Sequence, residues 1–183
     1  MKTLAIAGAV LCLPLNAAAQ VTERVSVDSS GGQAGFGGDL PVPPGLVLSP
    51  DGRYAAFSSP SVLDSGDTNG TWDVFIRDRL AGLTERVSVS TGGAQANGPS
   101  GLYAIAISAD GRFVAFDSTA NNLAPGDTNG VRDIFLRDRL GGTTELVSIA
   151  TGGVQGNGTS FHIAITPDAR FVAFESVASN LVA

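Results

Sequence analysis

Two short acidic segments, sixty positions apart, contain residue types that can bind a metal ion. In each, an Asp is followed by an Asn two positions on, then by a Gly and a closing Asp; the candidate metal ligands are Asp67, Asn69, Asp73, Asp127, Asn129 and Asp133. Oxygen ligands at this spacing, with a glycine for the bend, suit calcium. Ser65 and Pro125 stand where a calcium loop has its leading carboxylate. The alternative is an Asx turn, in which these side chains cap backbone amides.

Two glycine-rich segments carry side-chain amides suited to a polar ligand. Residues 91–98 read Thr-Gly-Gly-Ala-Gln-Ala-Asn-Gly, and residues 151–158 repeat this order with two changes. The candidate ligand-binding residues are Gln95, Asn97, Gln155 and Asn157. The alternative interpretation is a structural glycine-rich turn, in which the amides have no ligand.

Residues typical of catalytic sites are scarce. His162 is the single histidine and Cys12 the single cysteine, so no second His or Cys can share a metal or activate a serine. No Gly-x-Ser-x-Gly segment is present. Two carboxylates that act in catalysis are expected to occupy positions where the other repeats have different residues. We expect no acidic residue of this chain to differ from the repeat in this way. The sequence therefore predicts a protein that is not an enzyme.

An Arg-Asp-Arg triplet occurs at residues 77–79 and again at 137–139. One interpretation is a clamp for an anion, because guanidinium groups bind carboxylates and phosphates in a bidentate fashion. The other is a ladder of ion pairs between repeated units, which we favour because the triplet recurs with the repeat.

These segments belong to a repeat of about sixty residues. The Thr-Glu-Arg-Val-Ser-Val block and the Ser-Pro-Asp-Gly-Arg block each occur three times; the copies lie at 22–27, 84–89 and 144–149, and at 49–57, 108–116 and 166–174. The repeat divides residues 20–183 into units at 22–83, 84–143 and a shorter 144–183.

Each unit is predicted to contain four short strands; in the second unit they are 103–108, 112–117, 132–138 and 144–149. Asp110-Gly111 predicts a two-residue hairpin turn with positive φ at both positions. Runs such as Phe113–Phe116 are apolar at every position, which is typical of strands covered on both faces. Ala169 replaces the turn glycine in the third unit, so that hairpin needs either another turn or a strained backbone.

Repeated four-stranded units of this kind are typical of a β-propeller. The Ser-Pro-Asp-Gly-Arg block followed by Asp-Ile-Phe-Leu-Arg-Asp-Arg resembles the WD40-like (PD40) repeat of TolB-type propellers; the matching segments are 49–57, 108–116, 166–174, 73–79 and 133–139. The resemblance implies an all-β fold of antiparallel four-stranded meanders. Because this fold has many functions, the resemblance does not identify one.

Counting strands gives an incomplete ring of about two and a half blades. Since propellers have four to eight blades, we expect a fragment of a longer propeller, with open edges able to support self-association. Alternate connections of a meander share one end, so the long connections 118–131 and 150–160 are expected to form one rim. That rim is the predicted site for a protein partner or a polar ligand.

Composition and the first residues bear on localisation. Residues 1–19 have the pattern of a signal peptide, with Lys2 before an apolar run and an Ala-rich cleavage site. We therefore expect export to the periplasm or the outside of the cell, and no membrane span. The chain has eleven basic and seventeen acidic residues, which argues against nucleic-acid binding.

The sequence thus predicts an exported, non-catalytic propeller module that binds a protein or a ligand. One alternative is the propeller portion of a secreted hydrolase or lyase whose catalytic residues lie elsewhere. The other alternative is a calcium-binding repeat protein, with calcium as the only cofactor under consideration.

Overall fold

A computed structural model describes residues 22–33 and 45–182. Their regular structure consists of ten strands: β1 (Leu46–Leu48), β2 (Tyr54–Ser59), β3 (Asp73–Asp78), β4 (Leu83–Arg86), β5 (Ser100–Ile107), β6 (Phe113–Ser118), β7 (Asp133–Asp138), β8 (Thr143–Leu146), β9 (Ser160–Ile165) and β10 (Val172–Ser176). Among these residues, no helix has the length and apolar character needed to cross a membrane. The predicted signal peptide, residues 1–19, lies outside the described residues.

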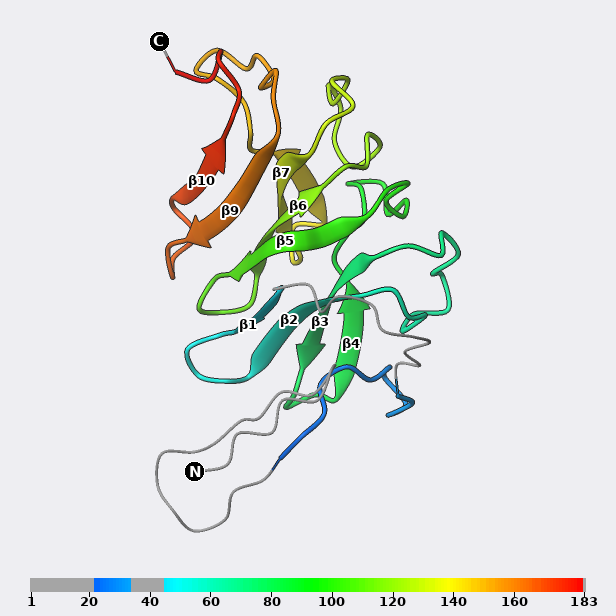
Figure 1. The fold of residues 1–183 in the computed structure, drawn as a ribbon. Helices are drawn as coiled ribbons and strands as arrows, with labels where there is room; N and C mark the ends of the chain where they lie inside the picture. Colours follow the sequence, from blue (N-terminus) through cyan, green and yellow to red (C-terminus); the bar gives the residue numbers. More distant parts are fainter. Residues whose placement is uncertain (1–21, 34–44, 183) are drawn as a thin grey trace.

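The strands form three antiparallel sheets that follow one another along the stack (Figure 1). Two sheets have four strands in sequence order, β1-β2-β3-β4 and β5-β6-β7-β8, and the third pairs β9 with β10. This is the four-stranded meander of a propeller blade, and the sheets stay open. The predicted all-β blade architecture is therefore confirmed. We call the three sheets blades A, B and C.

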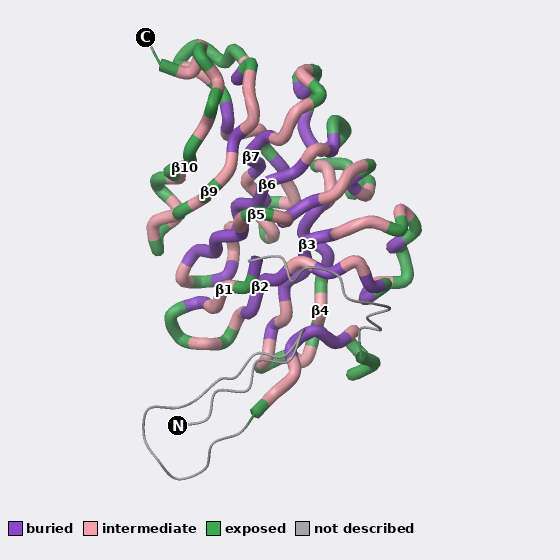
Figure 2. The backbone as a smooth tube through the Cα atoms, viewed as in Figure 1, coloured by how far each residue is buried: buried purple, intermediate pink, exposed green. Residues whose placement is uncertain are grey.

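The blades pack face to face through apolar side chains, and this packing explains the uninterrupted apolar runs. Val74 and Ile76 of blade A lie in one buried cluster with Ile105 and Ile107 of blade B. Figure 2 shows the buried backbone concentrated in blades A and B, while β9 and β10 alternate between intermediate and exposed. The central strands β2, β3, β6 and β7 are therefore covered on both faces, as the sequence predicts.

The turn between the first two strands of a blade differs from the predicted two-residue hairpin. In blade B, the backbone N–H of Gly111 donates to the Ser108 carbonyl (3.0 Å), and only Gly111 (φ +70°) has positive φ. The Asp110 carboxylate fixes this four-residue connection by accepting hydrogen bonds from Ser108 Oγ (2.6 Å) and the Arg112 N–H (3.0 Å). Ala169 keeps the same conformation in blade C at φ +57°, so the strained alternative is the correct one.

The fourth strand is shorter than the sequence predicts. β4 ends at Arg86 and β8 ends at Leu146, and a single bridge joins Val89 to Gln95 beyond β4. The chain leaves the sheet because the N–H of Val89 donates to the Val87 carbonyl (2.7 Å), which forms a tight local turn. Residues 22–27, the copy of the fourth-strand segment that comes first in the chain, have the same form, with a bridge at Val27 instead of a strand.

Candidate functional site: the long-loop rim and the inner-strand hollow

The two sets of long loops meet at one end of the stack, as expected for alternate connections of a meander, and a glutamine joins them. Gln95 follows β4, and its Nε2 donates to Asp67 Oδ1 (2.8 Å) in the β2–β3 loop and to Asp73 Oδ2 (3.0 Å) at the start of β3. The side-chain oxygen of Gln95, Oε1, accepts a hydrogen bond from the backbone N–H of Thr68 (3.1 Å). Asp73 is fully buried, and its carboxylate also accepts from Ser88 Oγ (2.5 Å). We call this arrangement the rim clasp.

Blade B contains a second rim clasp with nearly the same distances. Gln155 Nε2 donates to Asp127 Oδ1 (2.8 Å) and to Asp133 Oδ2 (3.0 Å). Asn129 Nδ2 donates to the same Asp133 oxygen (2.8 Å), just as Asn69 does to Asp73 in blade A. The repetition shows that the pattern is part of the scaffold.

The donors around these carboxylates are relevant to the predicted calcium sites. Calcium needs converging oxygen atoms, whereas Asp73 Oδ2 faces the amide nitrogens of Asn69 (2.9 Å) and Gln95 (3.0 Å). The Asn69 carbonyl oxygen accepts the Thr71 N–H (2.9 Å), which is the Asx-turn contact. Within 22–33 and 45–182, no group of three or more His, Cys, Asp or Glu residues could hold a metal ion. The donor set does not fit calcium, and calcium binding stays a prediction of the sequence.

Burial affects the ionisation of the rim clasps. Removal from water raises the pKa of Asp73, although hydrogen bonds from Ser88, Gln95 and Asn69 act in the opposite direction. Burial also raises the pKa of Asp127, against a hydrogen bond from Gln155. A neutral side chain of the same shape would therefore be tolerated at these sites better than at a solvated carboxylate.

The other two predicted ligand residues fasten one blade to the next. Asn97 lies between blades A and B, and its Nδ2 donates to Asn121 Oδ1 (2.7 Å) while its Oδ1 accepts the Asn121 N–H (3.1 Å). Asn157 makes the equivalent contacts with Ser179, at 3.0 and 2.9 Å. Gln95, Asn97, Gln155 and Asn157 thus all have partners within the protein. Ligand binding by them stays a prediction.

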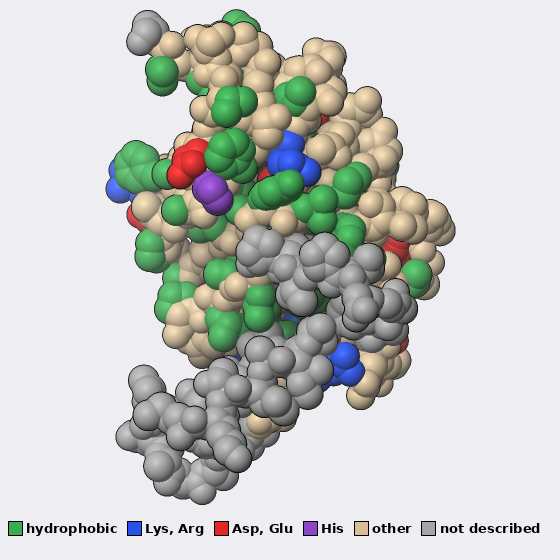
Figure 3. Space-filling view, viewed as in Figure 1, with side chains coloured by type: hydrophobic (Ala, Val, Ile, Leu, Met, Phe, Trp, Pro, Cys, Tyr) green, Lys and Arg blue, Asp and Glu red, His purple; other side chains and the backbone are tan. Residues whose placement is uncertain are grey.

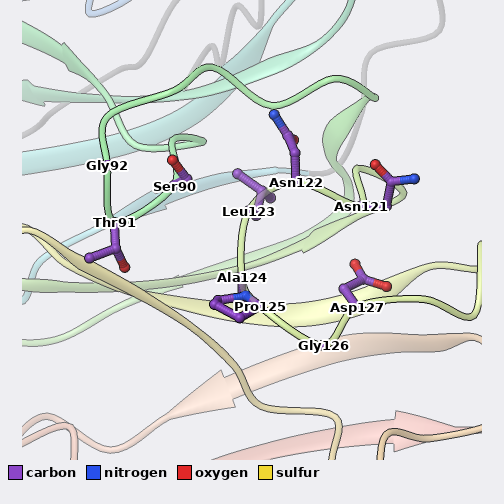
Figure 4. Close-up of a pocket in the computed structure, with 10 residues that line it drawn as sticks. All are labelled: Ser90, Thr91, Gly92, Asn121, Asn122, Leu123, Ala124, Pro125, Gly126 and Asp127. Atoms are coloured by element: carbon purple, nitrogen blue, oxygen red, sulfur yellow. The ribbon is translucent and has the colours of Figure 1, made fainter.

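A shallow hollow of about 380 Å³ lies beside these contacts, between residues 90–92 and 121–127 (Figure 4). Its apolar part is formed by the buried Leu123 and Ala124. Asn121 and Asn122 already form hydrogen bonds with residues 95–97. Asn122 Nδ2, for example, donates to the backbone carbonyl of Gln95 (2.7 Å). The rim hollow therefore offers a ligand few polar groups that the protein does not already use.

The Arg-Asp-Arg triplets form the predicted ladder in part. Arg139 pairs with Glu85 of the preceding blade (2.7 Å), which is a contact between units. Asp138 instead pairs with Arg112 within its own blade (2.6 Å), and this pairing lowers the pKa of Asp138 to about 2. Asp78 has the same environment beside Arg53, and its pKa is also lowered to about 2.

Acidic residues do depart from the repeat, contrary to the sequence-based expectation: Asp64 stands where the second unit has Ala124, and a further departure follows the Ser-Pro-Asp-Gly-Arg block. Aligning the three Ser-Pro-Asp-Gly-Arg blocks places Ser58, Asp117 and Glu175 in equivalent positions. Asp117 is fully buried, whereas Glu175 is exposed. Aligning the residue that follows each block would have revealed this departure from sequence alone.

In blade B the departing acid holds an arginine that is also unique to its repeat. Arg132 occupies the position of Trp72 in blade A, and its Nε lies 2.9 Å from Asp117 Oδ2. Asp117 Oδ1 accepts the backbone N–H groups of Tyr103 (3.0 Å) and Ala104 (2.8 Å). The Arg132 guanidinium lies 4.1 Å from the centre of the Tyr103 ring. Burial raises the pKa of Asp117, against these N–H groups and the Arg132 charge.

In blade C the departing acid meets the single histidine. His162 Nδ1 lies 3.1 Å from Glu175 Oε2, and both side chains are largely exposed. The register shifts between Phe174 and Glu175, so this segment is a β-bulge. His162 has φ +49°, a conformation that non-glycine residues rarely adopt. Bulges and strained residues of this kind often direct side chains toward functional sites.

His162 and Glu175 of blade C border a second hollow, of about 470 Å³, on the side of the first strands β5 and β9. Tyr103, on whose ring Arg132 stacks, borders it from blade B. Tyr103, His162 and Glu175 line it, together with apolar side chains that include Ile105 and Ile163. Figure 3 views this face, with the histidine beside an acidic side chain and hydrophobic side chains around them. We call it the inner-strand hollow. It combines an apolar surface with a few polar groups, as ligand sites do.

Comparisons with solved structures show similarity to two larger proteins. TolB from Acinetobacter baumannii has 16% sequence identity and a TM-score of 0.44, over 74% of this chain and 27% of TolB. Dipeptidyl peptidase 4 from Porphyromonas gingivalis has 19% identity and a TM-score of 0.46, over 73% of this chain and 22% of the peptidase. The chain thus spans about a quarter of their lengths. Comparison with protein-family models found no match, and comparison with curated protein sequences found none.

These likenesses have TM-scores below 0.5, so they carry no argument about function. The blade architecture stands on the strand order and register of the chain itself. Sequence reasoning located the rim residues and left open whether they bind a ligand or form a structural turn. It missed the Asp117–Arg132 and His162–Glu175 pairs, because each pair joins residues in or next to neighbouring strands that are thirteen or more positions apart in the sequence.

Proposed function

We propose that this chain is an exported, non-catalytic propeller module of the PD40 type that binds a ligand or a protein partner at the inner-strand hollow. One observation carries the proposal: the repeated polar residues of the rim join loops and blades, whereas His162 and Glu175, which replace other residue types of the earlier repeats, line this hollow. Selection for binding one partner acts on individual positions, while selection for a stable scaffold preserves the repeat.

The chemistry of the hollow supports binding in preference to catalysis. His162 and Glu175 form an exposed pair, and no nucleophilic serine or second histidine joins them among the described residues. The Asp117 carboxylate is occupied by two backbone N–H groups and Arg132. The alternative, the propeller portion of a secreted hydrolase or lyase, assigns catalysis to residues outside this chain.

Chemical-shift mapping tests the location of binding. We would titrate the ¹⁵N-labelled protein with pooled short peptides, amino acids and organic acids, and follow the backbone resonances. We expect changes concentrated at residues 101–105, 161–163 and 173–175. Changes confined to the rim residues 90–97 and 121–127 would contradict the proposal, and so would turnover of added ester or peptide substrates by the purified chain.

Export is tested separately. Expression of the full chain with fractionation of the cells should place a protein that begins near Gln20 in the periplasm or the medium. An uncleaved chain in the cytoplasm would contradict this part of the proposal.

A further inference from the structure

Beside the inner-strand hollow, Arg132 stacks on Tyr103, and its terminal nitrogens have no hydrogen-bond partner among the described residues. Asp117 engages Nε of Arg132, but no described residue accepts a hydrogen bond from Nη1 or Nη2, and neither atom is buried without a partner. The side chain keeps 17% of its exposure. Two guanidinium N–H donors on one side of the group therefore remain available to an acceptor from solution.

The position of this arginine is fixed from two sides. Oδ2 of the buried Asp117 lies 2.9 Å from Nε in an ion pair without hydrogen-bond geometry, and the centre of the Tyr103 ring lies 4.1 Å from the guanidinium carbon. Because Asp117 is itself anchored by the N–H groups of Tyr103 and Ala104, the three side chains form one unit. A guanidinium held in place in this way loses little conformational entropy on binding, which favours planar, bidentate partners.

The residues near Arg132 indicate the chemical character of the rest of such a ligand. Tyr103 lines the inner-strand hollow, and Ile105, Ile163 and Phe174 provide apolar surface within it. A volume of about 470 Å³ is in the range of small-ligand sites. A ligand that reached Arg132 with an anionic group would place its remaining atoms against apolar side chains.

We infer that the inner-strand hollow binds a carboxylate with an apolar body, and that the carboxylate pairs with the terminal nitrogens of Arg132. This inference rests on the proposed function and specifies its ligand class. The apolar body packs on Tyr103 and the isoleucines, and Glu175, which also lines the hollow, disfavours a second negative charge there. A free small acid and the C-terminus of a peptide share this chemistry.

Calorimetric titration of the full chain with matched acids and amides tests the inference. The probes are 4-methylpentanoate against 4-methylpentanamide, and acetyl-Gly-Leu acid against its C-terminal amide. We expect the acids to bind at least tenfold more tightly than the amides, because the amides lack the charge. Comparison of the two acids shows whether the natural source is a small molecule or a peptide. Equal affinity for acid and amide would overturn the inference.

Variants assign the binding to Arg132. Arg132→Gln should weaken acid binding at least tenfold, while Arg170→Gln, which removes an exposed arginine stacked on Phe171, should change it less than twofold. Arg132→Gln leaves Asp117 buried and unpaired, so the double variant Arg132→Gln/Asp117→Asn provides a neutral pair in case the single variant fails to fold. Retained acid binding in a folded Arg132 variant would overturn the inference.

The outcomes separate this inference from the proposed function. If no acid binds but other pooled ligands shift the resonances of 101–105 and 161–163, the carboxylate assignment falls and the binding module stands. If nothing binds at the hollow and ligands bind at the rim, both fall.

Discussion

Truncation of Asp73 tests the interpretation of the rim clasp. The fully buried carboxylate accepts hydrogen bonds from Ser88 Oγ (2.5 Å), Asn69 Nδ2 (2.9 Å) and Gln95 Nε2 (3.0 Å). Asp73→Ala leaves these three donors without an acceptor. At ~1–1.5 kcal/mol for each donor, the free energy of unfolding should fall by roughly 4 kcal/mol. For a chain of this size, that loss corresponds to a decrease in melting temperature of about 8–16 °C.

Asp73→Asn distinguishes a hydrogen-bonded clasp from a metal site. The amide oxygen can still accept from Asn69 and Gln95, and its NH₂ group can face Ser88 Oγ. Because burial already disfavours the charged form of Asp73, as its raised pKa shows, the neutral side chain costs little. We expect a loss of about 1 kcal/mol, or about 2–4 °C. A calcium site would lose a charged ligand in both variants and would make them similarly unstable.

The assay is thermal unfolding followed by circular dichroism, with and without calcium. Asp133→Ala, the equivalent change in blade B, should reproduce the loss, and Glu145→Ala, at an exposed position, should change stability by less than about 0.5 kcal/mol. The reasoning is refuted if Asp73→Ala and Asp73→Asn unfold at the same temperature, or if Asp73→Ala unfolds within 2 °C of the unaltered protein.

Three further predictions concern turns, metal and pH. Ala169→Gly should raise the free energy of unfolding by about 1 kcal/mol, because Ala169 has φ +57°. Gly111→Ala should lower the free energy of unfolding by more than this amount, because the added Cβ would overlap the Tyr54 ring. Urea unfolding measures both changes. The melting temperature should be the same in millimolar calcium and in chelator, and an increase in calcium would show that the metal binds the folded state. Stability should fall as the pH decreases from about 4 to about 2, because Asp78 and Asp138 have a pKa of about 2 in the folded state and the unfolded chain takes up protons first. Asp138→Asn should reduce this decrease in thermal scans across that pH range, and an unchanged slope would contradict it.

The sequence predicts the blades well because the blades are local. Apolar runs such as 113–116, bounded by turn residues, indicate strands covered on both faces, and the β6–β7 pairing has the expected antiparallel order. The predicted hairpin was wrong in detail because Asp110 binds Ser108 Oγ and the Arg112 N–H, and these contacts favour a longer connection.

The fourth strands were predicted too long for a tertiary reason. Val87 and Ser88 have strand-like types, but the N–H of Val87 donates to the Val74 carbonyl (2.7 Å) and Ser88 Oγ donates to Asp73. The chain turns at this point to complete the rim clasp. A contact between residues fifteen positions apart is not visible in local periodicity.

The rim residues show where a motif alone is ambiguous. Asp, Asn and Gly at this spacing are typical both of calcium loops and of Asx turns, and the sequence does not show which donors face the carboxylates. In the structure Gln95 directs its amide nitrogen to both aspartates, and this donor favours the Asx turn. Its role depends on the packing of two loops twenty-eight positions apart.

A double-mutant cycle between blades tests the central claim that the repeated rim amides fasten the scaffold together. Asn97 and Asn121 exchange two hydrogen bonds across blades A and B. Unfolding free energies of Asn97→Ala, Asn121→Ala and the double variant should give a coupling of about 0.5–1.5 kcal/mol. Losses that add within about 0.3 kcal/mol would show that the two amides do not act together. That result would contradict the account and leave Asn97 free for the predicted ligand site.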